Sequence, residues 1–301
     1  MSLNGFLKIK TFGSGSPNNP IGEPRPFYIL QNGVTVRLKG GLPPGTTGLA
    51  DGDFSGKVYT AVSQTELTQL NKFTTDWSLI CTTLCDSFSQ LFASISLNPP
   101  ISHFDTSNVN NLFQTFRFNP IFNTNIDYWD TSKVITMREL FRGCNEFNQP
   151  LNSWDVSECI EFSSALRTNS FNQPLNNWNP INAENMDFMF QGASSFNQNI
   201  DTWNVSSVED MQAMFANCSI FNSPLNSWDT SNVTQMSFMF SNAASFNKDI
   251  SSWCVEQIPF EPFAFALNSP LDNLPNFKPN WGATCGTINS PNKMTILTIT
   301  N

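Results

Sequence analysis

The chain has 301 residues, of which 13% are charged, and its formal net charge is −9 with a pI near 4.5. No basic cluster or basic helix stands out against this acidic balance, so nucleic acid and acidic membrane surfaces are disfavoured as partners. No apolar span approaches the roughly 18 residues that a membrane helix needs, and the N-terminus lacks the apolar segment of an ordinary signal peptide. We therefore expect neither nucleic-acid binding nor membrane insertion.

Residues 1–58 differ from the rest of the chain because they are rich in glycine and proline. Two strand-like runs, at 26–31 and 34–39, flank the dipeptide Asn32-Gly33. An Asn-Gly pair between apolar runs is a strong signal for a β-hairpin. We predict a small β element here, which either anchors the protein to a neighbour or simply covers the first repeat.

Residues 59–79 are predicted to form an N-terminal capping region. Ser63 and Glu66 have the spacing of a capping box, in which each side chain binds the other residue's backbone N–H. A helix from about 64 to 73 would then seal the open end of the array that follows, as terminal units of repeat proteins must.

The middle of the chain, residues 80–265, carries aromatic residues at an interval of 24 or 25 residues. Such a period is typical of a repeat protein whose units stack on one another. We predict about eight units, the first of them degenerate with Ile80 at the aromatic position. The aromatic positions of the later units are Phe104, Trp129, Trp154, Trp178, Trp203, Trp228 and Trp253.

Each unit is predicted to contain a short strand, a short helix and a loop. In the clearest copy, the run 225–231 around Trp228 suits a strand, and the apolar residues from Val233 to Phe240 have a helical spacing. No unit could bury its aromatic residues alone, but stacked units would bury them against one another at about 25 cal/mol per Å2 of apolar surface.

An asparagine follows the phenylalanine that opens each unit, and we predict that these residues form a structural ladder. A turn repeated at the same place leaves backbone groups pointing inward, and an amide can satisfy a donor and an acceptor together. The ladder positions are Asn123, Asn148, Asn172, Asn197, Asn222 and Asn247, with Asn98 as an earlier member.

The residues beside the tryptophans are the candidate binding residues, because they point outward if the tryptophans point inward. One file holds Asp105, Asp130, Asp155, Asn179, Asn204 and Asp229, and Tyr128 belongs to the file on the other side. A row of such side chains could coordinate Ca2+ or hydrogen-bond a carbohydrate. The simpler interpretation is that each aspartate caps its own helix.

The segment 147–157, Phe-Asn-Gln-Pro-Leu-Asn-Ser-Trp-Asp-Val-Ser, closely resembles the BspA-like surface-protein repeats that also occur in mycoplasma lipoproteins. The resemblance includes the Met-x-x-Met-Phe segments and covers residues 59 to about 286. That family is a divergent relative of the leucine-rich repeats. The resemblance therefore implies an α/β fold, a right-handed leucine-rich-repeat-like solenoid, closed by a cap and tail over 266–301.

Cysteines and other reactive residues give little sign of chemistry. Cys254 and Cys285 flank the closing cap and are the best candidates for a disulfide, and no set of residues has the spacing of a metal site. The single histidine, His103, is expected to be an exposed strand residue, and no pair of carboxylates is singled out as acid and base. We expect no enzyme, no metal and no cofactor.

Two classes of function remain. In the first, the repeats form a surface-displayed scaffold that recognises a protein or a glycan on another surface, as in adhesion. In the second, the chain is a structural component of a larger assembly, such as a virion exterior, and packs against neighbouring subunits through its terminal segments. Both place the protein on the exterior of a cell or particle.

Overall fold

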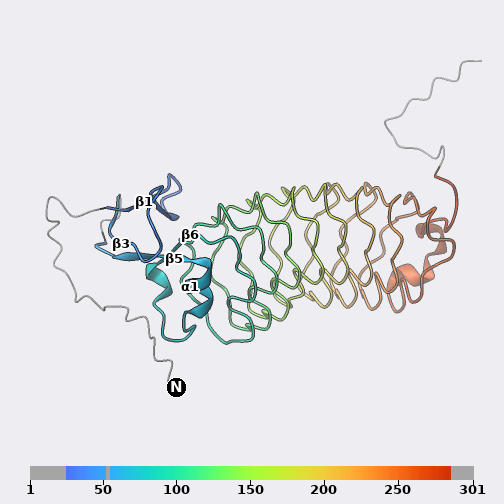
Figure 1. Ribbon diagram of the computed structural model, residues 1–301. Coiled ribbons are helices and arrows are strands. Elements are labelled where there is room, and N and C mark those ends of the chain that lie inside the picture. Colours follow the sequence, from blue (N-terminus) through green and yellow to red (C-terminus); the bar gives the residue numbers. More distant parts are fainter. Residues whose placement is uncertain (1–24, 52–54, 286–301) are drawn as a thin grey trace, which may run out of the picture.

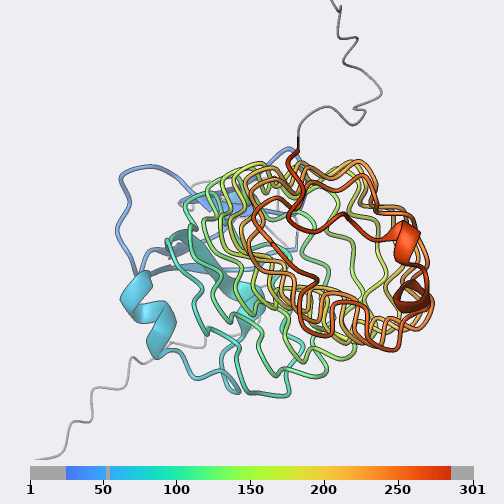
Figure 2. The same cartoon turned by 90° about the vertical axis from the view of Figure 1, so that its right-hand side faces the viewer.

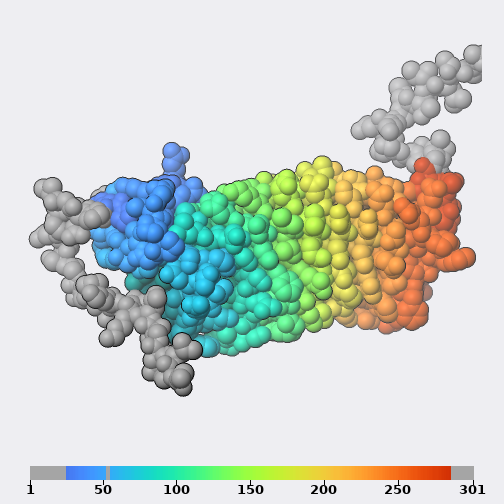
Figure 3. Space-filling view, in the orientation of Figure 1, coloured from blue at the N-terminus to red at the C-terminus, as the bar shows by residue number. Residues whose placement is uncertain are grey.

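The computed structural model describes residues 25–51 and 55–285. The chain winds into an elongated coil, whose turns follow one another from the N-terminal sheets at one end to a C-terminal cap at the other (Figure 1). Viewed from the end, successive turns lie around a common axis (Figure 2). In the space-filling view the colours form consecutive bands, so each turn lies beside its neighbours in sequence (Figure 3). We call each turn a rung.

Two small sheets cover the N-terminal end of the coil. In the first, β1 (Phe27–Ile29) pairs antiparallel with β2 (Val36–Leu38) and parallel with β4 (Ala50–Asp51). In the second, β5 (Tyr59–Ser63) pairs antiparallel with β3 (Thr47–Gly48) and parallel with β6 (Ile80–Leu84). The pairing of β1 with β2 confirms the predicted hairpin.

The hairpin loop is built by an asparagine and a glycine, as its sequence suggests. The side-chain oxygen of Asn32 accepts hydrogen bonds from the backbone N–H groups of Val34 and Thr35, at 2.9 and 3.0 Å. Gly33 has a φ of 73°, a conformation that favours glycine. The strands are thereby held in antiparallel register.

The capping box forms, but the helix that it begins is short. The Ser63 hydroxyl accepts from the Glu66 N–H at 3.2 Å, and Glu66 Oε2 accepts from the Ser63 N–H at 2.8 Å. Helix α1 spans Gln64–Gln69 and ends earlier than predicted, because Leu70 is extended and the Asn71 side chain binds the next backbone N–H groups. A one-turn 3-10 helix, η1 (Trp77–Leu79), then leads into β6.

The rungs lack the strand and helix that the sequence predicts for each unit. Between residues 85 and 269, all of which the structure describes, no helix forms, and the strand pairing consists of isolated parallel bridges. The bridges join equivalent positions of consecutive rungs, 24 or 25 residues apart. They link Ser87, Asn111, Thr136, Glu161, Asn185, Asp210 and Gln235 in turn.

These bridges lie in the segment that was expected to be helical. Met186 and Phe190 donate backbone hydrogen bonds to the next rung at 2.9 and 3.0 Å, and Phe188 between them does so at 2.8 Å with a φ of 53°. A left-handed residue breaks the helical hydrogen-bond pattern after each tight turn. The turns still direct Met186 and Phe190 into the core, so the apolar residues have the spacing of a helix. The backbone, however, forms its hydrogen bonds with the next rung.

Left-handed residues recur at the same place in every rung, which shows that the conformation belongs to the repeat. The positions are Gln90, Gln114, Glu139, Ser164, Phe188, Ala213, Phe238 and Ala264, with φ between 51° and 62°. None of these eight residues is glycine, so their strain is offset by the hydrogen bonds that the rungs exchange.

Three files of aromatic side chains fill the interior. The phenylalanines that open the units stack continuously at 5.6 to 6.2 Å, from Phe122 to Phe246. The tryptophans stack in pairs, for example Trp178 on Trp203 at 5.9 Å. A second phenylalanine stacks on the first within a rung, as Phe190 does on Phe196 at 4.1 Å. Apolar burial along these files is the main stabilising term of the coil.

The six tryptophans of the repeats also bind the preceding rung through their indole N–H groups. Trp129, Trp154, Trp178, Trp203, Trp228 and Trp253 donate to the carbonyls of Ile101, Ile126, Leu151, Leu175, Ile200 and Leu225, at 2.7 to 3.2 Å. A buried indole needs such a partner. The same contact therefore fixes the register of adjacent rungs.

The asparagines form a ladder on the surface, whereas the sequence suggested inward-pointing groups. The side-chain oxygen of each accepts a hydrogen bond from the backbone N–H of the next, at 2.8 to 3.1 Å. The preceding phenylalanine occupies the interior, so the asparagine faces outward. The ladder runs through Asn98, Asn123, Asn148, Asn172, Asn197, Asn222 and Asn247.

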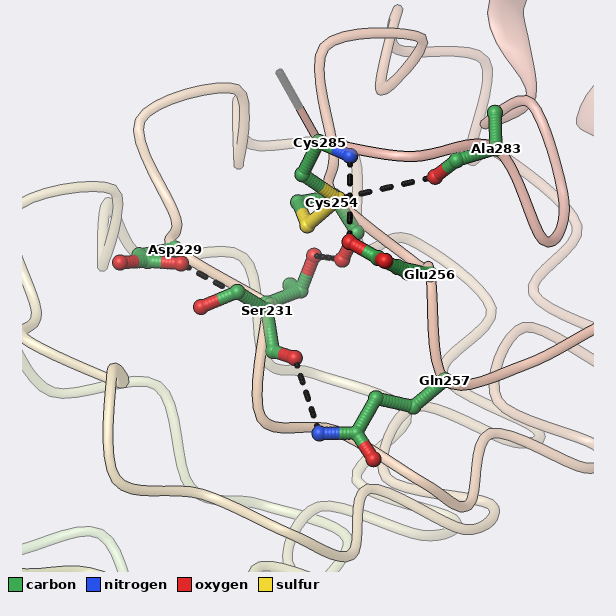
Figure 4. The surroundings of a disulfide bond; sticks show 8 residues. Asp229, Ser231, Cys254, Glu256, Gln257, Ala283 and Cys285 are labelled. Carbon is green, nitrogen blue, oxygen red and sulfur yellow. Dashed lines mark hydrogen bonds between the residues drawn. A yellow bond between two sulfur atoms is a disulfide. The ribbon is translucent and has the colours of Figure 1, made fainter.

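A cap of two 3-10 helices, η2 (Pro270–Asn273) and η3 (Pro275–Phe277), closes the far end of the coil. Trp281 meets Phe265 edge to face at 5.0 Å, which ends the stacked file. Cys254 and Cys285 are joined by a disulfide with a Cα–Cα distance of 5.6 Å (Figure 4). The bond ties the end of the cap to the last tryptophan-bearing rung.

Reducing this disulfide is expected to loosen the cap locally. Residues 278–285 should exchange their amide hydrogens faster, because the disulfide is their covalent link to the coil and few backbone hydrogen bonds join them to it. The central rungs should keep their protection, since each is held by its own neighbours. Hydrogen exchange with and without reductant measures this, and unchanged exchange over 278–285 would contradict it.

Candidate functional site

The predicted polar file consists mainly of residues that bind their own turn. The side-chain oxygens of Asp130, Asp155, Asn204 and Asp229 each accept from the backbone N–H of the serine two positions on, at 3.0 to 3.2 Å. Figure 4 shows Asp229 in this contact with Ser231. These contacts cap a turn, where the sequence suggested the start of a helix.

The other members of the file differ in their surroundings. Tyr128 is exposed, and so is Asn179, whose following residue is Pro180. Among residues 25–51 and 55–285, no group of three or more His, Cys, Asp or Glu side chains could hold a metal ion. We therefore keep a role of this file in binding as a prediction only.

Asp105 is buried and belongs to the junction between the N-terminal sheets and the coil. Arg37 donates two hydrogen bonds to its carboxylate, at 2.9 and 3.0 Å, and Thr83 donates another at 2.7 Å. Burial alone would raise the pKa of Asp105, but the hydrogen bonds from Arg37, Thr83 and Ser107 hold it below its usual value. Asp105 is thus a structural anchor and is not available to a ligand.

His103 lies in the same junction, whereas the sequence suggested an exposed residue. Its Nε2 is 2.9 Å from the Ile80 carbonyl, and its ring lies edge to face on Phe104 at 5.3 Å. Burial lowers the pKa of His103. The backbone of Val36 donates to the His103 carbonyl at 3.0 Å, so β2 packs directly on the first rungs.

Glu161 and Asp210 are two of the residues that form the parallel bridges between rungs. Each accepts a hydrogen bond from the backbone two residues on, at 2.9 and 2.7 Å. Burial raises the pKa of both carboxyls, and the nearby charge of Asp187 raises each further. Their hydrogen bonds are local, so we assign them a role in shaping the turns.

Arg117, Arg142 and Arg167 form a row, and they correct the expectation that the chain lacks a basic cluster. They occupy equivalent positions, 25 residues apart, on three consecutive rungs. Arg117 and Arg142 both contact the same Glu139 oxygen, at 2.6 and 3.0 Å. The Arg117 and Arg142 guanidinium carbons lie 4.4 and 5.3 Å from the centre of the exposed Phe118 ring.

Arg167 differs from the other two because no counter-ion contacts it within residues 25–51 and 55–285. Within the described residues it forms no ion pair and no side-chain hydrogen bond. Burial and the neighbouring Arg142 lower its pKa, while Glu139 acts in the opposite direction. The row therefore contains three cations and one carboxylate.

A shallow hollow of about 330 Å3 lies beside the row and crosses several rungs. The residues that line it include Phe118, Arg142 and Arg167, together with Asn145, Asn169 and Gln191. Sequence reasoning missed this site because the arginines are far apart in the chain. The signal was present, since they share the 25-residue interval of the aromatic residues.

The family model described as "Mycoplasma protein of unknown function, DUF285" matches residues 62–170 and again residues 161–270. Together the two matches span more than half of the chain. The chain belongs to the DUF285 family. No curated protein and no solved structure matches it. The mycoplasma part of the predicted resemblance is thus confirmed, and the kinship with leucine-rich repeats stays a prediction.

The DUF285 matches coincide with the stacked part of the structure. They begin at Val62, next to the N-cap of α1, and end at Pro270, where η2 begins. The N-terminal sheets and the disulfide-linked end of the cap lie mostly outside them. No helix of the described residues is long and apolar enough to cross a membrane.

Proposed function

We propose that the protein is a non-enzymatic repeat scaffold, displayed on the exterior of a cell or particle, that recognises a protein or a glycan on another surface. The proposal rests on one observation. The apolar side chains of the coil form one continuous core from Val62 to Leu271, which leaves the outer surface as the place for a ligand. We further infer that the coil is a solenoid, for which a right-handed leucine-rich-repeat-like form remains our expectation.

Binding to intact surfaces tests this function directly. The labelled full-length chain should bind saturably to a panel of cells, matrix proteins or immobilised glycans, and unlabelled chain should compete. Antibodies against the chain should label the outside of the intact cell or particle that makes it. Absence of saturable binding across such panels, or label found only after permeabilisation, would overturn the proposal.

A second candidate is a structural role in a larger assembly, and the last rung favours it. Phe260 and Phe263 are 81% and 75% exposed at the C-terminal end of the coil, with Leu267 beside them. Exposed apolar patches at the end of a repeat array are places where further copies pack. Light scattering of the full-length chain should then show self-association, and Phe260→Ser with Phe263→Ser should abolish it.

A further inference from the structure

The arginine row is a local concentration of positive charge on an acidic protein. The whole chain has six arginines, and four of them, Arg117, Arg138, Arg142 and Arg167, lie on three consecutive rungs. Of the carboxylates that the structure describes, one contacts the row, that of Glu139, at Arg117 and Arg142. The row therefore keeps an excess of positive charge that the described part of the protein does not neutralise.

The hydrogen-bonding groups of the row are also incompletely used. The Arg117 Nε–H is buried and is not aligned for a hydrogen bond, although Glu139 Oε2 is only 2.6 Å away. Arg167 has no side-chain partner within the described residues. Guanidinium groups held in a partly desolvated place are suited to a planar carboxylate, which can accept two parallel N–H bonds.

The hollow beside the row presents side-chain amides that no group in the described part of the chain binds. The side chains of Asn145, Asn169 and Gln191 line the hollow and make no hydrogen bond within the described residues. The ladder asparagines from Asn98 to Asn222, in contrast, use their side-chain oxygens to join adjacent rungs. Free amides offer donors and acceptors together, which matches the hydroxyl groups of a sugar.

Glycine keeps the hollow open. Gly192 lines it with a φ of 74°, and no atom lies within 4 Å of the position that a Cβ would take. The next two rungs carry Asn217 and Asn242 at this place, with φ of 60° and 56°. The backbone conformation at this position is therefore compatible with asparagine. Because residue 192 is glycine, the space that an asparagine side chain would fill stays open.

We propose that this hollow binds a carboxylated saccharide, such as a sialic acid or hexuronic acid residue, with the carboxylate on Arg142 and Arg167 and the hydroxyls on the neighbouring amides. The inference rests on the proposed recognition function and names its ligand class. A saccharide is favoured over an acidic peptide because the hollow is shallow and most of its lining residues are polar, with Phe118 the one large apolar side chain among them.

Calorimetry with defined probes tests the assignment on the full-length chain. At least one of two acidic probes, sialyllactose or a glucuronate-containing oligosaccharide, should bind at least about tenfold more tightly than lactose, since charge-assisted bonds to arginine strengthen binding by about this factor or more. The methyl ester of sialyllactose keeps the shape and removes the charge, and it should bind like lactose. Which of the two acidic probes binds identifies the source of the carboxylate.

Variants connect the binding to the hollow. Arg167→Gln should weaken the acidic probe about tenfold or more, and Gly192→Asn should block it by filling the space. Arg138→Gln is the matched control, because Arg138 is exposed on the same rungs and does not line the hollow. Circular dichroism should show that all three variants keep the fold.

Equal binding of the ester and the acid, or unchanged affinity in both Arg167→Gln and Gly192→Asn, would overturn the inference. So would tighter binding of an acidic peptide than of either saccharide. The proposed scaffold function would survive these results if the full-length chain still bound intact surfaces, so the two failures are distinguishable.

Discussion

Replacing Trp203 with alanine is expected to lower the free energy of unfolding by about 3–5 kcal/mol, the usual cost of deleting a buried aromatic side chain. Trp203 is 2% exposed, stacks on Trp178 at 5.9 Å and donates to the Leu175 carbonyl at 2.9 Å. The substitution would open a cavity between rungs that must stay in contact. Urea unfolding followed by circular dichroism measures the change.

Trp203→Phe is the matched control, because Phe104 naturally occupies the equivalent place in an earlier rung. It keeps a ring in the file but removes the indole donor. The Leu175 carbonyl would keep its hydrogen bond from the Trp178 backbone N–H, at 3.1 Å, so we expect a loss of only about 1 kcal/mol from the missing bond. A loss below about 1 kcal/mol for Trp203→Ala would contradict the stacked core.

Replacing Arg37 with alanine should loosen the first N-terminal sheet, β2-β1-β4, from the coil. Asp105 is 1% exposed, and Arg37 is the cation that binds its carboxylate within the described residues. Removing one partner of a buried ion pair leaves an uncompensated charge and costs about 3–5 kcal/mol. We expect this loss at the junction, measured as faster amide exchange in β1 and β2.

An exposed ion pair of the same sheet provides the control. Lys39 and Asp51 are 2.8 Å apart, but their side chains are 45% and 48% exposed. Such surface pairs contribute about 0–1 kcal/mol. Lys39→Ala should therefore leave the amide exchange of β1 and β2 nearly unchanged, and a loss as large as that of Arg37→Ala would argue against the anchoring role of Asp105.

Acid should loosen the same junction in two stages. Burial lowers the pKa of His103, so as the pH falls the imidazole is protonated in the unfolded junction before it is protonated in the folded one. The stability of the folded junction therefore falls as the pH drops below about 6.5. The pKa of Asp105 is also held below its usual value, so a further loss begins below about 3.9. Amide exchange of β2 against pH checks this, with the central rungs as an internal reference.

The sequence by itself determined the periodic core of this protein. Aromatic residues 24 or 25 positions apart have room in the interior only if successive turns stack, so Trp178 and Trp203 could be placed in one file from their spacing. The capping box of Ser63 and Glu66 and the hairpin around Gly33 were also readable, because both depend on residues close together in the chain.

The tertiary structure decided the conformation of the rungs and the location of the charged site. Met186, Met189 and Phe190 have a helical spacing, but hydrogen bonds to the next rung stabilise left-handed residues such as Phe188 and prevent a helix. Likewise, Arg167 gains much of its surroundings from residues on neighbouring rungs, such as Arg142 and Gly192, each 25 positions away. Local sequence carries no information about groups that only stacking brings together, so these features follow from contacts between rungs.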